Sequence, residues 1–256
     1  MDTRFWGPSG WRLLHSITFA YIPRTDKVAV REMFTALPYV LPCKYCRFSL
    51  SEHMEELPLE PALESRELLT QWLWKIHNKV NAKLRAQRIN QTQEDPPFDK
   101  VKEYYTELLN TGCTRTIFPG WEFLFSIADL HPMSTLAKKS QPISGAPPCE
   151  HITSIQEKNK WNCMSHNERL PYYQQFWKYI GLTLPFKEWR DIWISAPCNL
   201  DSRISTTKWL WKLRCSMETE LELLNKCNFA SLCKNLQSYR SDCSKSARGK
   251  TCRKRR

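Results

Sequence analysis

Hydrophobic side chains recur at three- and four-residue spacing through the first 110 residues, the pattern of helices that bury one face. This pattern predicts four long helices and a short fifth, over residues 8–22, 27–40, 43–56, 65–86 and 99–110. Pro23 ends the first helix, Pro42 precedes the third, and Ser65 is the expected N-cap of the fourth. Because such short connections favour antiparallel neighbours, we expect an all-α bundle.

The first two helices supply part of the expected core. Pro8 lies in the first turn of the first helix, where the N–H that proline lacks would have no partner. The apolar stripe of this helix is expected to comprise Trp11, Leu14 and Thr18. The largely apolar positions of the second helix are Val28, Met33, Phe34, Leu37 and Tyr39.

The hydrophobic pattern of the first half recurs in the second half in the same order. The matching segments are 10–17 with 120–127, 41–47 with 184–190, and 65–75 with 202–212. One match between tryptophan-rich helices could arise by chance, but three in one order favour an internal duplication. We therefore predict two helical domains, residues 1–115 and 116–233, with a Pro-, Ser- and Lys-rich linker or long loop at 132–166.

The net charge of +12 is concentrated at one end of the chain. Residues 234–256 carry nine Lys and Arg against the single acid Asp242, so this tail contributes +8 and the rest of the chain only +4. We expect a disordered, solvated tail. The alternatives are nuclear targeting or weak attraction to nucleic acid and anionic surfaces.

Composition and motifs exclude several classes of protein. With 7 Gly and neither GxGxxG nor GxxxxGK[ST], a Rossmann or P-loop nucleotide site is not expected. There is no signal-peptide pattern and no apolar run of about 18 residues, so we expect no membrane segment. Eleven cysteines are unusual without a secretory signal. Either most are inert thiols, or the protein makes disulfides itself.

Cys43 and Cys46 form a CxxC pair at the expected start of a helix. Two sulfurs at this spacing can form a disulfide, and the amide N–H groups of a helix N-terminus stabilise a thiolate. A zinc site would need a second CxxC or an HxxxH pair nearby, whereas the next cysteine is Cys113. We therefore expect a redox-active dithiol and no metal, with a purely structural disulfide as the alternative.

Two further blocks flank the CxxC pair: GPSGWRLLH at residues 7–15 and WLWKIHNKVN at residues 72–81. In this order the three blocks resemble the Erv/ALR family of FAD-linked sulfhydryl oxidases, most closely those of large DNA viruses. The resemblance covers residues 1 to about 110. It implies the Erv four-helix bundle with a short fifth helix, FAD as the cofactor, and, in the second half, a degenerate Erv-like domain.

Helical spacing places the candidate residues in groups, since Trp11 and His15 share one helix face, as do His77 and Asn81. Without the family context these would be ordinary core and helix-edge residues. The resemblance implies that Cys43 faces solvent and exchanges with substrate thiols, whereas Cys46 passes electrons to the flavin. The FAD contacts it implies are Gly7, Trp11, His15, Tyr21, Cys46, His77, Asn78, Val80, Asn81, Lys83 and Tyr105.

The duplicated half keeps the packing residues and loses the groups that could bind flavin or move electrons. The aligned replacements are Phe125 for His15, Phe186 and Trp189 for Cys43 and Cys46, and Arg214, Cys215 and Glu218 for His77, Asn78 and Asn81. We therefore expect no FAD at the equivalent place. The degenerate half could instead cover a surface that simpler Erv domains bury in homodimers, and a homodimer of the whole chain stays open.

The implied reaction oxidises protein or small-molecule dithiols and passes the electrons through Cys43 and Cys46 to FAD and then O2, giving H2O2. Family members often use a second disulfide as a shuttle, for which the candidates are Cys227/Cys233, Cys243/Cys252 and Cys149/Cys163. We expect a viral protein of the host cytoplasm or the virion. The alternatives are a non-enzymatic helical scaffold with a nucleic-acid-binding tail and, more weakly, a zinc-dependent nucleic-acid binder.

Overall fold

The computed structural model describes residues 1–87, 94–111, 115–138 and 140–240. Across these residues the chain is helical and has no β-strand, which confirms the predicted all-α fold. The helices of the first half are α1 (Thr3–Ala20), α2 (Pro23–Val40), α3 (Lys44–Glu56), η1 (Glu60–Glu64), α4 (Arg66–Ala86) and α5 (Phe98–Asn110). Those of the second half are α6 (Trp121–Asp129), α7 (Thr135–Lys138), η3 (Cys149–His151), α8 (Ile155–Lys160), α9 (His166–Ile180), η4 (Gly181–Thr183), α10 (Lys187–Ser195), α11 (Arg203–Glu220) and α12 (Phe229–Ser238).

Helix α1 begins at Thr3, five residues before the predicted start. The Asp2 carboxylate accepts a hydrogen bond from the Arg4 N–H at 2.9 Å and caps the helix. Pro8 therefore lies inside α1 rather than in its first turn. The sequence-based prediction treated Pro8 as a start signal and missed the capping aspartate.

Helix α2 also begins early, at Pro23 rather than at residue 27. Proline is well suited to the first helical position, and the Asp26 carboxylate accepts a hydrogen bond from the Ile22 N–H at 3.0 Å. The third to fifth helices begin within about one residue of the predicted positions. Ser65 caps α4 as predicted, because its hydroxyl accepts a hydrogen bond from the Leu68 N–H at 3.1 Å.

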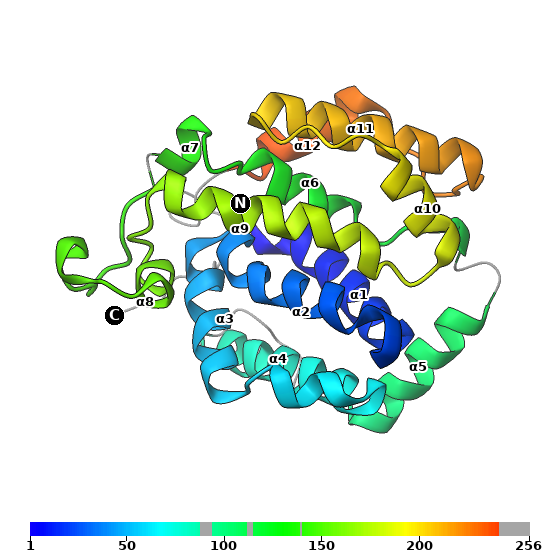
Figure 1. The fold of residues 1–256 in the computed structure, drawn as a ribbon, viewed down its shortest axis with the longest axis horizontal. Coiled ribbons are helices and arrows are strands. Elements are labelled where there is room, and N and C mark those ends of the chain that lie inside the picture. The colour runs from blue at the N-terminus through cyan, green and yellow to red at the C-terminus, as the bar shows by residue number, and fades with distance from the viewer. Residues whose placement is uncertain (88–93, 112–114, 139, 241–256) are drawn as a thin grey trace.

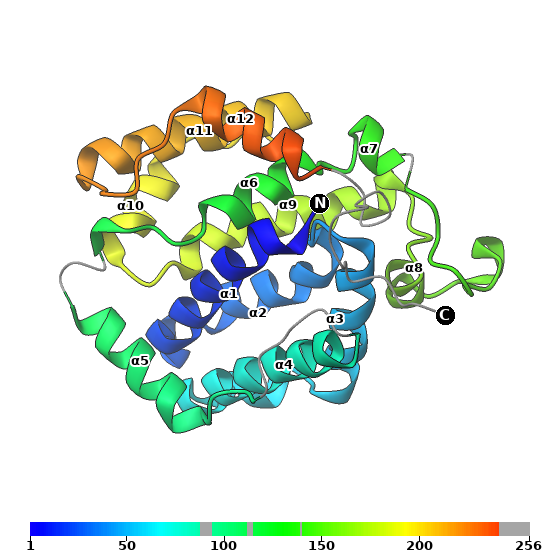
Figure 2. The ribbon, with the colours of Figure 1, turned by 180° about the vertical axis from the view of Figure 1, so that it is seen from behind.

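Helices α1 and α2 lie in the middle of the molecule, between two groups of helices (Figures 1 and 2). Helices α3, α4 and α5 lie on one side, and α6, α9, α10, α11 and α12 lie on the other. Helix α1 contacts both α4 and α6, and α2 packs along α9. The two halves therefore share one continuous hydrophobic core.

Helix α1 is buried on two opposite faces, so its core stripe is wider than predicted. Leu13 and Ile17 are buried in addition to Leu14 and Thr18. The close approach of α1 and α6 leaves little space at Gly10, because an added Cβ would lie 3.0 Å from the Phe123 ring. A surface helix buries one stripe, whereas a helix inside a core buries most of its circumference.

Helix α2 is attached to α9 by stacking and hydrogen bonds. The rings of Tyr39 and Tyr172 are stacked with their centroids 3.7 Å apart. The Gln175 amide donates hydrogen bonds to the Glu32 backbone carbonyl at 3.0 Å and to its carboxylate at 2.9 Å. Val28, which the sequence placed among the apolar core positions, is 59% exposed because it lies on the opposite side of α2.

The segment 132–166 is more ordered than the predicted linker. It contains α7, η3 and α8, and a disulfide joins Cys149 to Cys163. Helix α8 packs on α3, as Figure 1 shows at the left edge of the molecule. Short helices of four to six residues carry too little periodicity to be recognised in the sequence.

The first residues of the predicted disordered tail are instead helical, because α12 continues to Ser238. Tyr239 then stacks on Phe5 with ring centroids 4.7 Å apart. The Arg240 guanidinium forms an ion pair with the Asp129 carboxylate at 2.5 Å, and that side chain is 1% exposed. Residues 241–256, including Cys243 and Cys252, lie outside the described residues. None of the described helices has the length and apolar character needed to cross a bilayer.

We expect a fragment of residues 1–115 to self-associate, because removing the second half exposes the faces of α1 and α2 that now pack on α6 and α9. Sedimentation velocity at micromolar concentration should show dimers or larger species for the fragment. Circular dichroism should confirm that the fragment is helical, and the full-length chain serves as the control. A soluble, helical and strictly monomeric fragment would contradict this prediction.

Candidate functional site

A cavity of about 1080 Å3 lies between α1, α3, α4 and α5 and reaches the start of α6. This volume is at the upper end of the range for ligand pockets, roughly 300–1,000 Å3. The predicted site residues that line it are Gly7, Trp11, Cys46, His77, Val80, Asn81, Lys83 and Tyr105. Residues spread over about 100 positions of the sequence therefore meet around one space.

The CxxC pair lies where helix α3 begins. Cys43 is the N-cap, with an extended backbone, and its carbonyl accepts hydrogen bonds from the N–H groups of Cys46 and Arg47, each at 3.0 Å. The amides of the first turn are thereby directed toward the CxxC end of the helix. Positive electrostatic potential at this end favours a sulfur that carries negative charge.

The two cysteines differ in their surroundings. Cys46 lines the cavity, as predicted for the sulfur that faces the cofactor, whereas Cys43 is 5% exposed and does not line it. Burial of Cys43 differs from the solvent-facing position that the family resemblance implied. The segment before α8 lies beside it, because the adjacent Lys44 ammonium donates hydrogen bonds to the carbonyls of Gln141 at 2.9 Å and Pro142 at 3.4 Å.

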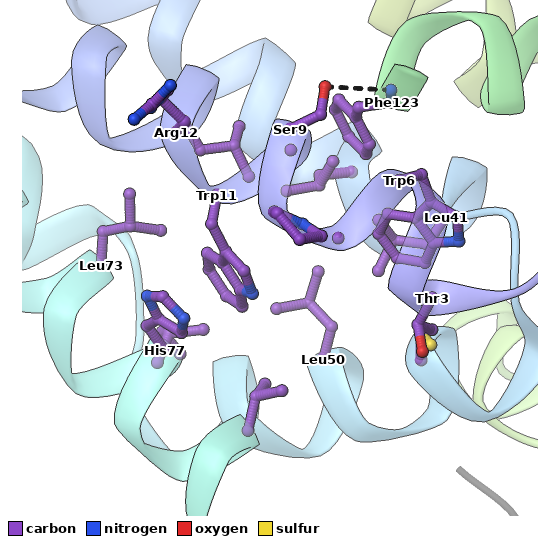
Figure 3. A pocket seen from close by; sticks show the side chains of 18 of the residues that line it. Thr3, Trp6, Ser9, Trp11, Arg12, Leu41, Leu50, Leu73, His77 and Phe123 are labelled. Carbon is purple, nitrogen blue, oxygen red and sulfur yellow. Dashed lines mark hydrogen bonds between the residues drawn. The ribbon is translucent and has the colours of Figure 1, made fainter. Parts of the chain in front are cut away.

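An aromatic group connects α1 to α4 across the cavity. Trp11 of α1 stacks on His77 of α4 with ring centroids 3.9 Å apart and an interplanar angle of 12°, and Figure 3 shows the two rings facing each other. His15, one turn after Trp11, lies with its Nε2 3.2 Å from Nδ1 of His77. Tyr105 of α5 stacks on His15 at 5.0 Å. The rings of Trp11, His77 and Tyr105 thus line one wall of the site, and His15 contacts them from behind.

Both histidines are neutral near pH 7. Burial and, to a smaller extent, the neighbouring His77 lower the pKa of His15 to about 3. Burial also lowers the pKa of His77 to about 4, although the Asp95 carboxylate opposes this shift. In the contact between the two rings one nitrogen donates and the other accepts, which requires at least one neutral imidazole.

Several residues at or beside the cavity are not among the predicted FAD contacts. Arg12 and Tyr104 line it, and the Arg12 guanidinium donates a hydrogen bond to the Tyr104 hydroxyl at 3.0 Å. Asp95 accepts a hydrogen bond from the Asn81 amide at 2.8 Å and pairs with Arg85 at 2.7 Å. The hydrogen bond to Arg85 is the main reason that the pKa of Asp95 is lowered. No local motif marks these residues, because each acts through a partner distant in the sequence.

The end of α4 is also connected to α3. The Lys83 ammonium donates a hydrogen bond to the Ser49 hydroxyl, and both residues line the cavity. Ser49 lies one turn after the CxxC pair, so this contact holds α4 beside the cysteines. Ser49 is a further cavity residue that the sequence did not indicate.

Three of the predicted FAD contacts do not line the cavity. The Tyr21 hydroxyl donates a hydrogen bond to the Leu63 carbonyl at 2.8 Å inside the bundle, so Tyr21 has a packing role here. Asn78 lies beside the cavity-lining His77 but is not part of the wall. His15 stands behind His77 and contacts it directly.

The part of the chain that forms this site is similar in sequence to known proteins. Residues 8–106 match the model of the Erv1 / Alr family. This region, called the Erv1/Alr region below, is therefore similar to that family. The family match therefore includes every predicted site residue except Gly7, and it ends before α6.

Three relatives match within this Erv1/Alr region. A probable FAD-linked sulfhydryl oxidase of Acanthamoeba polyphaga mimivirus is 36% identical over 85 residues, which are 32% of this chain and 59% of the relative. The mitochondrial FAD-linked sulfhydryl oxidase ERV1 of Saccharomyces cerevisiae is 34% identical over 92 residues (35% and 48%). A putative FAD-linked sulfhydryl oxidase of invertebrate iridescent virus 3 is 27% identical over 88 residues (33% and 59%).

The chain thus spans about half to three fifths of the length of these relatives. No solved structure is significantly similar to it.

The cavity of the Erv1/Alr region suits a large ligand that is flat and aromatic in one part and polar in another. Flat ring faces come from Trp11, His77 and Tyr105. Nδ1 of His15 is buried and has no hydrogen-bond partner among the described residues, so the site retains an unused polar atom. Arg12 and Lys83 supply positive charge at the edge of the cavity.

The lowered pKa values predict that acid destabilises the fold. Below about pH 6.5 the unfolded chain protonates both histidines, whereas the folded chain keeps them neutral until the pH approaches 4 for His77 and 3 for His15. The free energy of unfolding is therefore expected to be highest above pH 6.5 and to fall by about 1–2 kcal/mol per histidine at pH 5. Urea unfolding at pH 7.5 and pH 5.0 measures this.

His77→Gln should lose less stability on acidification than the wild-type chain, because it lacks one of the two titrating rings. His151→Gln is the matched control, since His151 is exposed and should not change the pH dependence. An equal loss of stability in His77→Gln and the wild type would show that the buried pair does not cause it.

Proposed function

We propose that this protein is an FAD-dependent thiol oxidase that makes disulfide bonds. The observation that carries the proposal is that Cys46 lines the same cavity as the stacked Trp11 and His77 rings. The family match and the relatives named as FAD-linked sulfhydryl oxidases support FAD as the ligand. When bound, FAD supplies the two-electron acceptor that O2 reoxidises, with H2O2 as the product.

The residues around the cavity can hold FAD by stacking, hydrogen bonding and charge. Trp11, His77 and Tyr105 offer flat surfaces for its ring systems. The Asn81 amide can both donate and accept hydrogen bonds, and Lys83 and Arg12 can pair with phosphate. The buried Nδ1 of His15 can form a hydrogen bond with a polar edge of the ligand if the His77 side chain moves aside.

The thiol chemistry belongs to the CxxC pair. A substrate thiolate attacks the Cys43 sulfur of the oxidised pair, forms a mixed disulfide with Cys43 and releases Cys46 as a thiolate. A second substrate thiolate then attacks the mixed disulfide, which releases the substrate disulfide and leaves Cys43 as a thiolate. The amides at the start of α3 stabilise both thiolates. Because Cys43 is buried, we propose small dithiols or flexible protein segments as substrates.

The shuttle candidates differ in the structure. Cys149 and Cys163 form a disulfide that closes a segment packed on α3. Cys227 and Cys233 are free thiols, so this pair is not bonded. Cys243 and Cys252 lie outside the described residues. We therefore favour a structural role for the Cys149–Cys163 disulfide, and a shuttle role for Cys227 and Cys233 stays a prediction.

We further propose that the second half is a degenerate copy of the Erv1/Alr region. In both copies an arginine turns back to the carbonyl six residues earlier: Arg47 donates to Leu41 at 2.7 Å, and Arg190 donates to Leu184. A serine cap begins both α4 and α11, and α1 packs on α4 as α6 packs on α11. These shared details support duplication beyond the similarity of the sequences.

The copied site is filled with side chains. Phe125 and Trp189, which take the places of His15 and Cys46, are at most 1% exposed. Where Trp11 stacks on His77, Trp121 has the Arg214 guanidinium 5.2 Å from its ring. Arg214 is buried and paired with Glu218 at 2.6 Å. We propose that the second half binds no FAD and serves to cover and position α1 and α2.

The two viral relatives support a viral source, and we propose that the enzyme makes disulfides in the host cytoplasm or in the virion. Disulfides there need an oxidant outside the secretory pathway. Weak nucleic-acid binding by the basic tail is a further proposal, and it is tested by the salt dependence of DNA binding.

Purified full-length protein should be yellow and should consume O2 when a dithiol is added. Cys46→Ser should keep the bound flavin but lose at least about 99% of the O2 uptake, because the sulfur next to the ligand is removed. Cys215→Ser is the matched control, since this free thiol lies on α11 outside the cavity. A colourless protein would favour the scaffold alternative, and full activity of Cys46→Ser would refute the electron path.

A further inference from the structure

A segment from the second half is attached to the start of α3. We define the docked loop as residues 140–163, which the Cys149–Cys163 disulfide closes over its last 15 residues. The Asn159 amide donates hydrogen bonds to the Pro38 carbonyl at 3.1 Å and the Ser51 hydroxyl at 3.3 Å. Trp161 packs edge-on against Phe48 of α3 with ring centroids 5.2 Å apart. The docked loop is thus hydrogen-bonded to and packed against α3, the helix that carries the CxxC pair.

Arg47 stands between the CxxC pair and the docked loop. It lies four residues after Cys43, so the two share a helix face. Its guanidinium turns back toward the start of α3 and donates a hydrogen bond to the Leu41 carbonyl, two residues before Cys43, at 2.7 Å. A second hydrogen bond, at 2.5 Å, goes to the Asn162 side-chain oxygen of the docked loop. The charge of Arg47 is therefore fixed at the level of Cys43.

The backbone conformation and hydrogen bonds of Asn162 direct its side-chain oxygen toward Arg47. Its backbone has a φ of 59°, in the left-handed region that asparagine adopts more readily than most residues. Its side-chain amide donates to the Gln141 carbonyl at 2.8 Å and the Ser140 hydroxyl at 3.1 Å. All polar atoms of the side chain are thus used, which leaves its oxygen directed at Arg47.

The positive charge at this place has no carboxylate partner. Among the described residues, Arg47 and Arg169 form no ion pair, and Arg169 donates only to the Tyr39 carbonyl and the Asn159 side chain, each at 2.8 Å. Nε of Arg47 is buried without a hydrogen-bond partner among the described residues. Burial lowers the pKa of Arg47, whereas Cys43 and Cys46 oppose that shift. Burial and the neighbouring Arg47 also lower the pKa of Arg169. A buried cation without a counter-ion is costly, and a nearby thiolate would relieve that cost.

The duplicated half shows what a purely structural arginine at this place does. Arg190 makes the corresponding bond to the Leu184 carbonyl, but its charge pairs with the Asp26 carboxylate at 3.2 Å. Phe186 and Trp189 stand there in place of the cysteines. In the second half, which lacks the thiols, Arg190 pairs with a carboxylate. In the first half, which has the thiols, Arg47 pairs with none among the described residues.

We propose that Arg47, held by Asn162 of the docked loop, is a positioning residue that favours the thiolate form of Cys43 over the thiol. The proposal rests on the thiol-oxidase function proposed above. The Cys43 thiol gives its proton to solvent, and the remaining thiolate is stabilised by the adjacent guanidinium. The Cys149–Cys163 disulfide fixes the docked loop, and the docked loop holds Arg47 in place. The disulfide can thus act on the CxxC pair without exchanging with it.

Other charged groups around this end of α3 are accounted for. Lys44 bonds to carbonyls of the docked loop, and Lys83 of α4 bonds to Ser49. Arg169 of α9 adds a second positive charge, whereas Glu168 is held by Lys158 and the Ser165 cap, which lower its pKa to about 2. Arg4 of α1 lines the cavity and pairs with Asp2. The nearby charge is thus mainly positive, and Arg47 is the cation bonded to the backbone two residues before Cys43.

The test measures how fast Cys43 is alkylated as a function of pH. Without oxygen, full-length protein is given just enough reductant to reduce the CxxC pair, and mass spectrometry checks that the Cys149–Cys163 disulfide stays intact. The protein is then treated with iodoacetamide between pH 5 and pH 9 and digested with trypsin, which cuts after Lys44 and separates Cys43 from Cys46. Each profile is scaled to its own limiting rate, so differences in access cancel. Arg47→Met should move the midpoint of the Cys43 profile upward by about one pH unit, which makes alkylation at pH 7 up to about tenfold slower.

Two further variants and one control separate the effect of the Arg47 charge from a general loss of stability. Arg47→Lys keeps the charge without the paired bonds and should give a smaller shift. Asn162→Gly removes the anchor while tolerating the positive φ, and should shift the midpoint in the same direction. Arg190→Met is the matched control: it should lower the thermal stability, because it breaks the bond to Leu184 and the pair with Asp26, but leave the Cys43 profile unchanged.

Profiles of Arg47→Met and Asn162→Gly that coincide with the wild-type profile would overturn the proposal, as would an equal shift in Arg190→Met. The readout does not depend on turnover. A protein without flavin or oxidase activity whose Cys43 profile still depends on Arg47 would sink the proposed function and leave this inference standing. An active oxidase whose Cys43 profile does not depend on Arg47 would support the proposed function and overturn this inference.

Discussion

The site depends on one packing constraint: α1 must fit against α4 on one face and against α6 on the other. On the first face Trp11 stacks on His77. On the second face Gly10 leaves room for the Phe123 ring, and the Ser9 hydroxyl accepts a hydrogen bond from the Phe123 N–H at 3.3 Å, drawn dashed in Figure 3. A helix packed on both faces cannot turn without breaking one of them. The second half therefore fixes the cavity wall without contributing a reactive group to it.

The same division of labour applies to the cysteines. The Erv1/Alr region supplies the CxxC pair and the helix N-terminus, whereas the second half supplies the docked loop that lies on α3. In the first half, Arg47 faces thiols and neutral oxygen atoms, and its counterpart Arg190 faces a carboxylate. After duplication, the second copy lost the residues that could bind flavin or exchange thiols. Its remaining contacts can still position the residues of the active copy.

Much of the fold and part of the site could be predicted from the sequence. Helix α4 and its Ser65 cap follow from periodicity and a local capping signal, and the CxxC pair is a local motif. The early start of α1 at Thr3 and the burial of Cys43 could not be predicted. The first depends on the Asp2 cap, which lies before Pro8, and the second on a loop about 100 residues away. Asp95 and Ser49 were missed for the same reason, since their partners are on other elements.

The central claim is that Cys46 and the aromatic wall of α1 and α4 face one flavin. An experimental structure of the full-length protein with FAD tests this claim most directly, through the distance from the Cys46 sulfur to the isoalloxazine ring. The account predicts van der Waals contact, about 3.5–4 Å, with the ring inside the cavity beside Trp11 and His77. A flavin bound elsewhere, or a Cys46 sulfur turned away from the ring, would contradict it.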